Sequence, residues 1–225
     1  MTRYIYTAPF PHQQATQLSK QGSYEVITPS RLAARAISAQ HQPLQAIALK
    51  YLQQQGQIKA SPLQAQKQFR QTLQEVLQPA DLLGTARAWM PAAKSLLQSC
   101  PSFVQASADS FTNLSARTAG LIGVAQQYQS TLHESSLFDA DELYWRADEL
   151  EATKLKQQPL LVYGYFQPRA DELAWLNKVA GSGSLFFIDE SPLFADMQAA
   201  VSWLQQRGWE VMSSDTASSD IVPIR

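Results

Sequence analysis

The sequence has one cysteine, three histidines and no surplus of either charge, and each shortage excludes a class of site. Cys100 has no second cysteine with which to form an internal disulfide, and no metal-ligand spacing surrounds it. His12, His41 and His133 are too far apart in sequence to form the HxxH or HxxxH pair of a typical metal site. We therefore expect no disulfide framework, no metal site and no cofactor.

Long hydrophobic runs and a basic excess are also missing. No segment is long and apolar enough for a membrane span, and the first residues lack the apolar stretch of a secretory signal. We therefore expect a cytoplasmic chain that makes no contact with a membrane. The net charge is −1, whereas stand-alone nucleic-acid binders usually carry a basic excess. Any contact with nucleic acid must then be local, weak or shared with other domains.

The sequence does contain enough apolar material for a core, since 45% of its 225 residues are hydrophobic and only 16% are charged. Short strand-like runs occupy residues 4–7 and 24–28, and helical spacing follows each of them. The strand pattern returns in three later runs, again with helical spacing between them, at residues 159–164, 185–188 and 209–212. This alternation predicts an α/β fold with a parallel sheet.

The middle of the chain differs from both ends. Residues 43–155 show helical spacing throughout, with no convincing strand. We therefore expect a doubly wound sheet of about five strands formed by residues 1–42 and 156–225. An all-helical subdomain, residues 43–155, is expected to be inserted between the second and third strands.

The loop after the first predicted strand lacks the residues that a phosphate-binding loop needs. Such a loop uses glycines to bring backbone N–H groups onto the phosphates, and a lysine for the terminal phosphate. This loop has neither, and its two prolines remove N–H donors. The segment, which we interpret as a vestigial nucleotide loop, consists of Thr7, Ala8, Pro9, Phe10, Pro11 and His12.

Two groups of acidic residues allow alternative interpretations. Asp189 and Glu190 resemble a Walker B pair, in which Asp holds magnesium and Glu polarises water. The alternative, that they cap the helix after Ser191 and Pro192, is favoured because a Walker B pair needs a phosphate loop opposite it. The second group suits metal binding or proton transfer, but a solvated helix face is the simpler prediction. Its members are Asp139, Asp141, Glu142, Asp148, Glu149 and Glu151.

The order of segments resembles the first half of superfamily I helicases of the UvrD/RecB type, and especially the helicase-like half of AddB-type recombination nucleases. Residues 26–35, which include Thr28, Ser30 and Arg31, are similar to the family segment that contacts single-stranded DNA. Residues 121–145 look like a motif late in the inserted helical subdomain of that family. The resemblance implies a P-loop-NTPase-like core.

The same resemblance places substitutions at the nucleotide motifs. Tyr163 and Gly164 stand where the family has its magnesium-binding and water-activating acids. Asp189 falls on the aspartate of the next motif, with Glu190 beside it. The resemblance therefore implies a core whose hydrolysis motifs have been lost, so that this chain alone is not expected to be an enzyme. It also implies that a second motor domain and any nuclease domain belong to further C-terminal domains or to a partner subunit.

The function implied by the resemblance is a scaffold that handles single-stranded DNA in repair and recombination. Thr28, Ser30 and Arg31 would hold phosphates, while aromatic residues such as Tyr163, Tyr165 and Phe166 would stack on bases or pack in the core. Two alternatives remain. One is a protein-interaction module that docks a partner subunit without touching DNA, which the neutral charge favours. The other is an active nucleotide hydrolase with an unfamiliar phosphate site.

Overall fold

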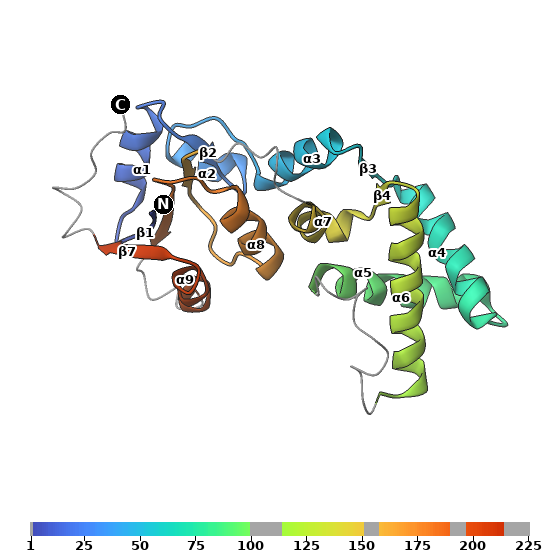
Figure 1. Cartoon of the computed structure of the whole chain (residues 1–225). Helices are drawn as coiled ribbons and strands as arrows, with labels where there is room; N and C mark the ends of the chain where they lie inside the picture. The colour runs from blue at the N-terminus through green and yellow to red at the C-terminus, as the bar shows by residue number, and fades with distance from the viewer. Residues whose placement is uncertain (1, 100–113, 151–157, 190–196, 214–225) are drawn as a thin grey trace. The chain divides into compact units, whose positions relative to one another are not determined.

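The computed structural model describes residues 2–99, 114–150, 158–189 and 197–213 of the protein. The chain divides into two compact units (Figure 1). The sheet unit comprises residues 1–47 and 151–225, and the helical unit comprises residues 48–150. The sequence had predicted the two divisions after residues 42 and 155.

The sheet unit contains five parallel strands, as the alternation of patterns predicts. The strands lie in the order β2-β5-β6-β1-β7. Helices connect them, which confirms the predicted α/β class. The elements are β1 (Arg3–Ala8), α1 (His12–Ser19), β2 (Glu25–Ile27), α2 (Arg31–Ala36), β5 (Leu160–Val162), α8 (Ala170–Val179), β6 (Leu185–Asp189), α9 (Met197–Gln205) and β7 (Trp209–Ser213).

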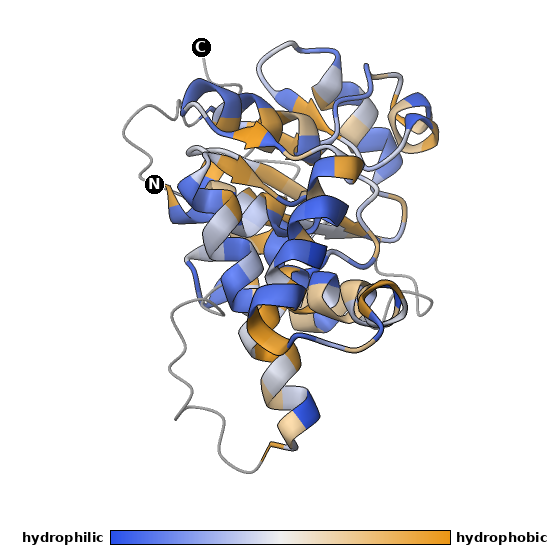
Figure 2. Ribbon diagram, turned by 90° about the vertical axis from the view of Figure 1, so that its right-hand side faces the viewer, coloured by the Kyte–Doolittle hydropathy of each residue, from blue (hydrophilic) through white to orange (hydrophobic). Residues whose placement is uncertain are grey.

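The burial of each strand follows its place in the sheet. The two strands β5 and β6 are apolar at almost every position, and both are buried on both faces, as expected for interior parallel strands. The edge strand β7 buries Trp209 but exposes most of its other side chains. Figure 2 draws the interior strands mostly in hydrophobic colours. The apolar runs in the sequence therefore mark the centre of the sheet.

The two faces of the sheet carry different helices. On one face, Tyr6 and Phe187 pack with Leu18 of α1 and with Ile37, which follows α2. On the other face, Val162 and Phe186 border residues of α8. Successive side chains of a strand point to opposite faces, so this alternation separates the two helical layers.

The strand order determines where a crevice opens. The first strand, β1, lies between β6 and β7, well away from β2. In the dinucleotide-binding and flavodoxin-like orders the first and second strands are neighbours, so neither order fits. Here β2 and β5 are neighbours, and the chain leaves them toward opposite faces, through Ile37 after β2 and through α8 after β5. Ligands of open α/β sheets bind at such a point, outside the carboxyl ends of the strands.

The helical unit is built on three long helices whose apolar faces form one core. Its largest fully buried side chains include Phe69, Leu73 and Tyr128, and the Phe69 and Tyr128 rings meet edge to face at 5.4 Å. The elements here are the end of α3 (Leu44–Gln54), then β3 (Ile58–Lys59), α4 (Pro62–Leu77), α5 (Leu82–Ser99), α6 (Ala116–Glu134), β4 (Leu137–Phe138), the short helix η2 (Ala140–Glu142) and α7 (Leu143–Glu149).

The prediction of an all-helical insertion was wrong in one respect, because β3 and β4 form a small parallel pair. The backbone N–H of Ile58 donates to the Ser136 carbonyl, and that of Ala60 donates to the Phe138 carbonyl, each at 2.9 Å. Strands of two residues are too short to show an alternating pattern, so they could not be predicted from the sequence.

Across the described ranges, no helix combines the length and the apolar character that a membrane crossing requires.

Candidate functional site

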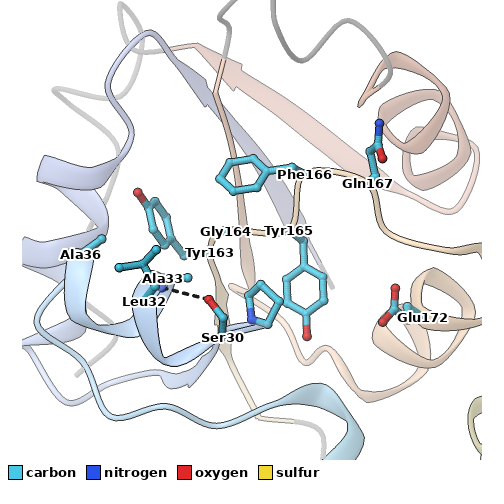
Figure 3. A pocket seen from close by; sticks show the side chains of 11 residues that line it. Ser30, Leu32, Ala33, Ala36, Tyr163, Gly164, Tyr165, Phe166, Gln167 and Glu172 are labelled. Carbon is cyan, nitrogen blue, oxygen red and sulfur yellow. Dashed lines mark hydrogen bonds between the residues drawn. The ribbon is translucent and has the colours of Figure 1, made fainter.

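A groove with a volume of about 560 Å³ opens at the carboxyl ends of β2 and β5 (Figure 3). This volume lies within the range of small-molecule and cofactor sites. One wall is α2, and the other is the segment between β5 and α8. The residues that line this α2 groove are Pro29, Ser30, Leu32, Ala33, Ala36, Tyr163, Gly164, Tyr165, Phe166, Gln167 and Glu172.

Gly164 brings the two walls of the α2 groove into contact. Its φ of +85° is one that L side chains rarely adopt. A Cβ atom at this position would lie 2.7 Å from the Cβ of Ala33 and 3.6 Å from Pro29. Only glycine therefore fits here without moving α2. The family resemblance leads one to look for an aspartate or glutamate at this position. The Cβ of either residue would clash with Ala33 in the same way.

Aromatic side chains form the wall that follows β5. Phe166 is 49% exposed, and Tyr163 is half-buried. The hydroxyl oxygen of Tyr165 accepts a hydrogen bond from the backbone N–H of Leu44 at 3.4 Å. Burial, reinforced by the charge of Glu172, raises the pKa of Tyr165 to about 12, so its hydroxyl stays protonated at neutral pH. The three predicted stacking residues thus line the groove together, although Tyr163 also packs against the core of the sheet unit.

The apolar residues of α2 and its end divide between the groove and the core. Leu32, Ala33, Ala36 and Ile37 follow one another at helical spacing, and only Ile37 of these is buried. Leu32 is 78% exposed, and it lines the groove with Ala33 and Ala36. Ala34 packs inward instead. From the sequence alone, an apolar stripe that lines a groove cannot be distinguished from one that packs in the core, because the distinction depends on what lies opposite the helix.

Two arginines lie on the flank of α2. Arg31 and Arg35 are one helical turn apart, beside the row formed by Leu32 and Ala36. Both are exposed, and neither enters a salt bridge within the described part of the chain. No acidic residue lies in the helix. The exposed side of α2 is therefore locally positive although the whole chain is not.

Of the predicted phosphate contacts, Ser30 lines the groove, Arg31 flanks it, and Thr28 does neither. The Ser30 hydroxyl accepts from the backbone N–H of Ala33 at 3.2 Å and so caps α2. The Thr28 side chain is fully buried, with its hydroxyl 3.0 Å from Nδ1 of His41. Thr28 therefore joins the end of β2 to the segment that follows α2, since its backbone N–H also donates to the Gln42 carbonyl at 3.0 Å.

A much smaller cavity of about 90 Å³ is lined by Pro11, which belongs to the segment that the sequence suggested as a vestigial nucleotide loop. This volume is well below that of ordinary ligand pockets. Pro11, where α1 begins, closes it from one side, with Tyr163 and Phe166 on another. Thr7 and Ala8 belong to β1, Pro9 and Phe10 are exposed, and His12 is the first residue of α1. No lysine or arginine is among the described residues that line the cavity.

Asp189 ends β6 and borders this small cavity. Burial, followed by the nearby charge of Asp189, raises the pKa of Tyr163. Glu190, Ser191 and Pro192 lie outside the described residues. Within the described ranges, no group of three or more His, Cys, Asp or Glu residues is arranged to hold a metal ion.

The acidic group in the helical unit is not the solvated helix face that we expected. Asp139 is 1% exposed and Glu142 is fully buried. Asp141, Asp148 and Glu149 are more accessible, and Glu151 lies outside the described residues. Charge composition alone suggests a solvated face, because an acid is rarely buried without partners.

The buried acids are compensated by hydrogen bonds, which we call the Asp139 network. Asp139 accepts from the Tyr128 hydroxyl at 2.6 Å and from Lys94 Nζ at 3.2 Å. Glu142 accepts from the backbone N–H of Asp139 at 2.8 Å, and it also contacts Gln129 and His133. Each of these partners belongs to the helical unit, so the network fixes η2 onto α5 and α6.

Acid should weaken the helical unit through Asp139. Burial alone would raise the pKa of Asp139, but hydrogen bonds from Tyr128 and the Asp141 N–H, together with the Lys94 charge, hold it below its ordinary value of 3.8. A lowered folded-state pKa contributes stability above the unfolded-state value, and this stability is lost as pH falls through the folded-state pKa. We expect urea unfolding to show a steeper loss of stability below about pH 4 in the wild type than in Asp139→Asn. Equal pH dependence in both proteins would contradict this.

No protein-family model and no curated protein matches the chain. Its function is therefore inferred from its own residues and their geometry. Glu172 lines the groove but was not predicted as a site residue from the sequence. Glu172 stands at the third position of α8, where an acid is the ordinary capping residue, so nothing in the local pattern marks it as part of a site.

Proposed function

We propose that the sheet unit is a degenerate, P-loop-NTPase-like helicase core that holds single-stranded DNA without hydrolysing nucleotide. Its setting would be a repair or recombination helicase–nuclease. The observation that carries the proposal is the α2 groove, with three aromatic residues on one wall and two arginines flanking the other. The strands β5, β6 and β1 are also successive neighbours in the sheet, and this arrangement is compatible with the family's segment order.

The groove suits an unpaired strand better than a duplex. Aromatic side chains stack on bases whose faces are free, and each such contact is worth about 1–3 kcal/mol. Phe166 and Tyr163 offer such rings, and Arg31 and Arg35 offer charge for phosphates on the opposite rim. Because the chain as a whole has no basic excess, we expect modest affinity that falls as the salt concentration rises.

The geometry of the small cavity supports the proposed loss of hydrolysis. A nucleotide needs backbone N–H donors, a cation and room for its phosphates. The loop supplies prolines, the cavity has a volume of only about 90 Å³, and Gly164 has no space for an acidic side chain. The protein is therefore proposed to bind DNA in the same way with or without ATP and magnesium.

The test is fluorescence anisotropy of a labelled single-stranded oligonucleotide, titrated with the whole chain at several salt concentrations. We expect Arg31→Ala with Arg35→Ala to weaken binding and to flatten the salt dependence, by about 0.7 in slope for each phosphate that is no longer neutralised. Lys20→Ala, which removes a cation at the end of α1, is the control and should leave both unchanged. A shift in affinity on adding ATP and magnesium would overturn the proposed loss of the nucleotide site.

A second candidate function is a module that docks a partner subunit. The exposure of the apolar side chains of Leu32 and Phe10 supports this candidate. Exposed apolar side chains of this size are common at protein interfaces. If the wild type fails to bind single-stranded DNA even at low salt, the DNA proposal is wrong and this alternative takes its place. The partner would then be a helicase or nuclease subunit.

A further inference from the structure

We infer that the α2 groove selects bases that carry an exocyclic amino group, cytosine over thymine, through the carboxylate of Glu172. This inference rests on the proposed binding of single-stranded DNA and adds a base preference to it. Sequence preference among single-strand binders otherwise arises mainly from stacking and backbone flexibility. A carboxylate placed inside the groove would add a hydrogen-bond acceptor that distinguishes bases by their edges.

The first support is the unused acceptor capacity of Glu172. Its side chain is 18% exposed and lines the groove on the α8 side (Figure 3). One oxygen, Oε2, accepts from the backbone N–H of Arg169 at 3.0 Å. The other, Oε1, lies 3.9 Å from the Arg169 guanidinium, which is too long for a hydrogen bond. Oε1 can therefore accept a donor from a ligand.

The second support is that the ion pair between Glu172 and its neighbour Arg169 is long, at 3.9 Å. The guanidinium of Arg169 is engaged by Asp171, with Nε–Oδ1 and Nη2–Oδ2 distances of 3.0 and 3.1 Å. This two-point geometry orients the guanidinium toward Asp171. Glu172 also lies near Tyr165, where its charge, after burial, helps to raise the pKa of that hydroxyl.

The third support is the polarity across the groove. Arg31 and Arg35 lie on α2, next in sequence to residues that line the groove, whereas Glu172 lines the opposite wall. Phosphates are attracted to the first side and repelled by the second, so the bases of a bound strand would face Glu172. Carboxylates accept hydrogen bonds from the cytosine N4 amino group. Thymine has no such group, and its carbonyl oxygens would meet the carboxylate unfavourably.

The experiment compares oligo(dC) with oligo(dT) of equal length by anisotropy, at one salt concentration and neutral pH. Both are pyrimidines, so differences in stacking are small. We expect the wild type to bind oligo(dC) about tenfold more tightly, the effect of one good base-edge contact. In Glu172→Gln the ratio should fall close to one, because the amide offers both a donor and an acceptor.

The variants separate base selection from folding and from general charge. Glutamine can replace glutamate in the cap that Glu172 forms with Arg169, so α8 is expected to persist, as circular dichroism would show. Glu210→Gln makes the same change of charge at an exposed site on β7, the far edge strand, and should keep the wild-type ratio. Equal binding of both oligonucleotides by the wild type, or an unchanged ratio in Glu172→Gln, would overturn the inference alone. Failure to bind either would overturn the proposed function as well.

Discussion

Gly164→Ala is expected to lower the free energy of unfolding of the protein by about 2–4 kcal/mol and to weaken single-stranded DNA binding. The new methyl group would sit 2.7 Å from Ala33, and the φ of +85° would strain an L residue in addition. The clash can be relieved only if α2 moves, and α2 carries one wall of the groove with Arg31 on its flank. Urea unfolding and DNA anisotropy measure the two effects.

Gly208→Ala provides a control with almost the same strain and no clash. Gly208 has a φ of +81°, and a methyl group added there would have nothing within 4 Å. It precedes β7, away from the α2 groove. This variant should lose only the strain component, about 1–2 kcal/mol, and bind DNA as the wild type does. If both variants lose equal stability, the contact with Ala33 does not contribute.

Adding Ala33→Gly to Gly164→Ala tests the contact directly. The second substitution removes the atom with which the new methyl group collides. Glycine within α2 costs about 1 kcal/mol on its own. We nevertheless expect the double variant to be more stable than the sum of the two single changes predicts, and to regain part of the DNA binding. Additive losses would mean that the two walls do not meet as described.

Asp139→Ala is expected to destabilise the protein by about 3–5 kcal/mol, the usual cost of removing one partner from a buried ion pair. The substitution leaves the Tyr128 hydroxyl and the Asp141 N–H without their acceptor, and it deprives Lys94 of one carboxylate. Because these groups join η2 to α5 and α6, the loss should appear as a lower urea midpoint. The slope of the transition should stay unchanged if unfolding remains cooperative.

Glu75→Ala is the matched control for Asp139→Ala. Glu75 is an exposed acid of α4 whose carboxylate accepts a hydrogen bond from Gln71. Exposed interactions of this kind contribute about 0.5 kcal/mol or less, so the control should be nearly neutral. A loss below about 1 kcal/mol for Asp139→Ala would show that water or rearranged partners replace the carboxylate.

Much of the fold could be predicted because its signals are local. The runs that became β1, β5 and β6 are apolar and short, and a helix begins at a cap such as Ser30, which follows β2. The strand pairing could not be predicted in the same way. It depends on which strands lie side by side, and the pair β3–β4 brings together residues from opposite ends of the helical unit.

The candidate site was predictable only in part. Ser30, Arg31 and the aromatic residues after β5 stood out by position and type, and the structure brings Ser30 and these rings to one groove. Thr28 has the same chemistry as Ser30 in the sequence, yet its side chain points into the interior. Glu172 was missed because its local role as a helix cap accounts for it fully.

The sequence by itself determined that the first loop cannot hold a phosphate in the ordinary way, because prolines and the lack of glycine and lysine act within that loop alone. It also determined the alternation of strands and helices, which depends on local spacing. Only the tertiary structure decided that Leu32 lines a groove and that Asp139 is buried. Exposure depends on what packs against a side chain, and the packing partners come from distant parts of the chain.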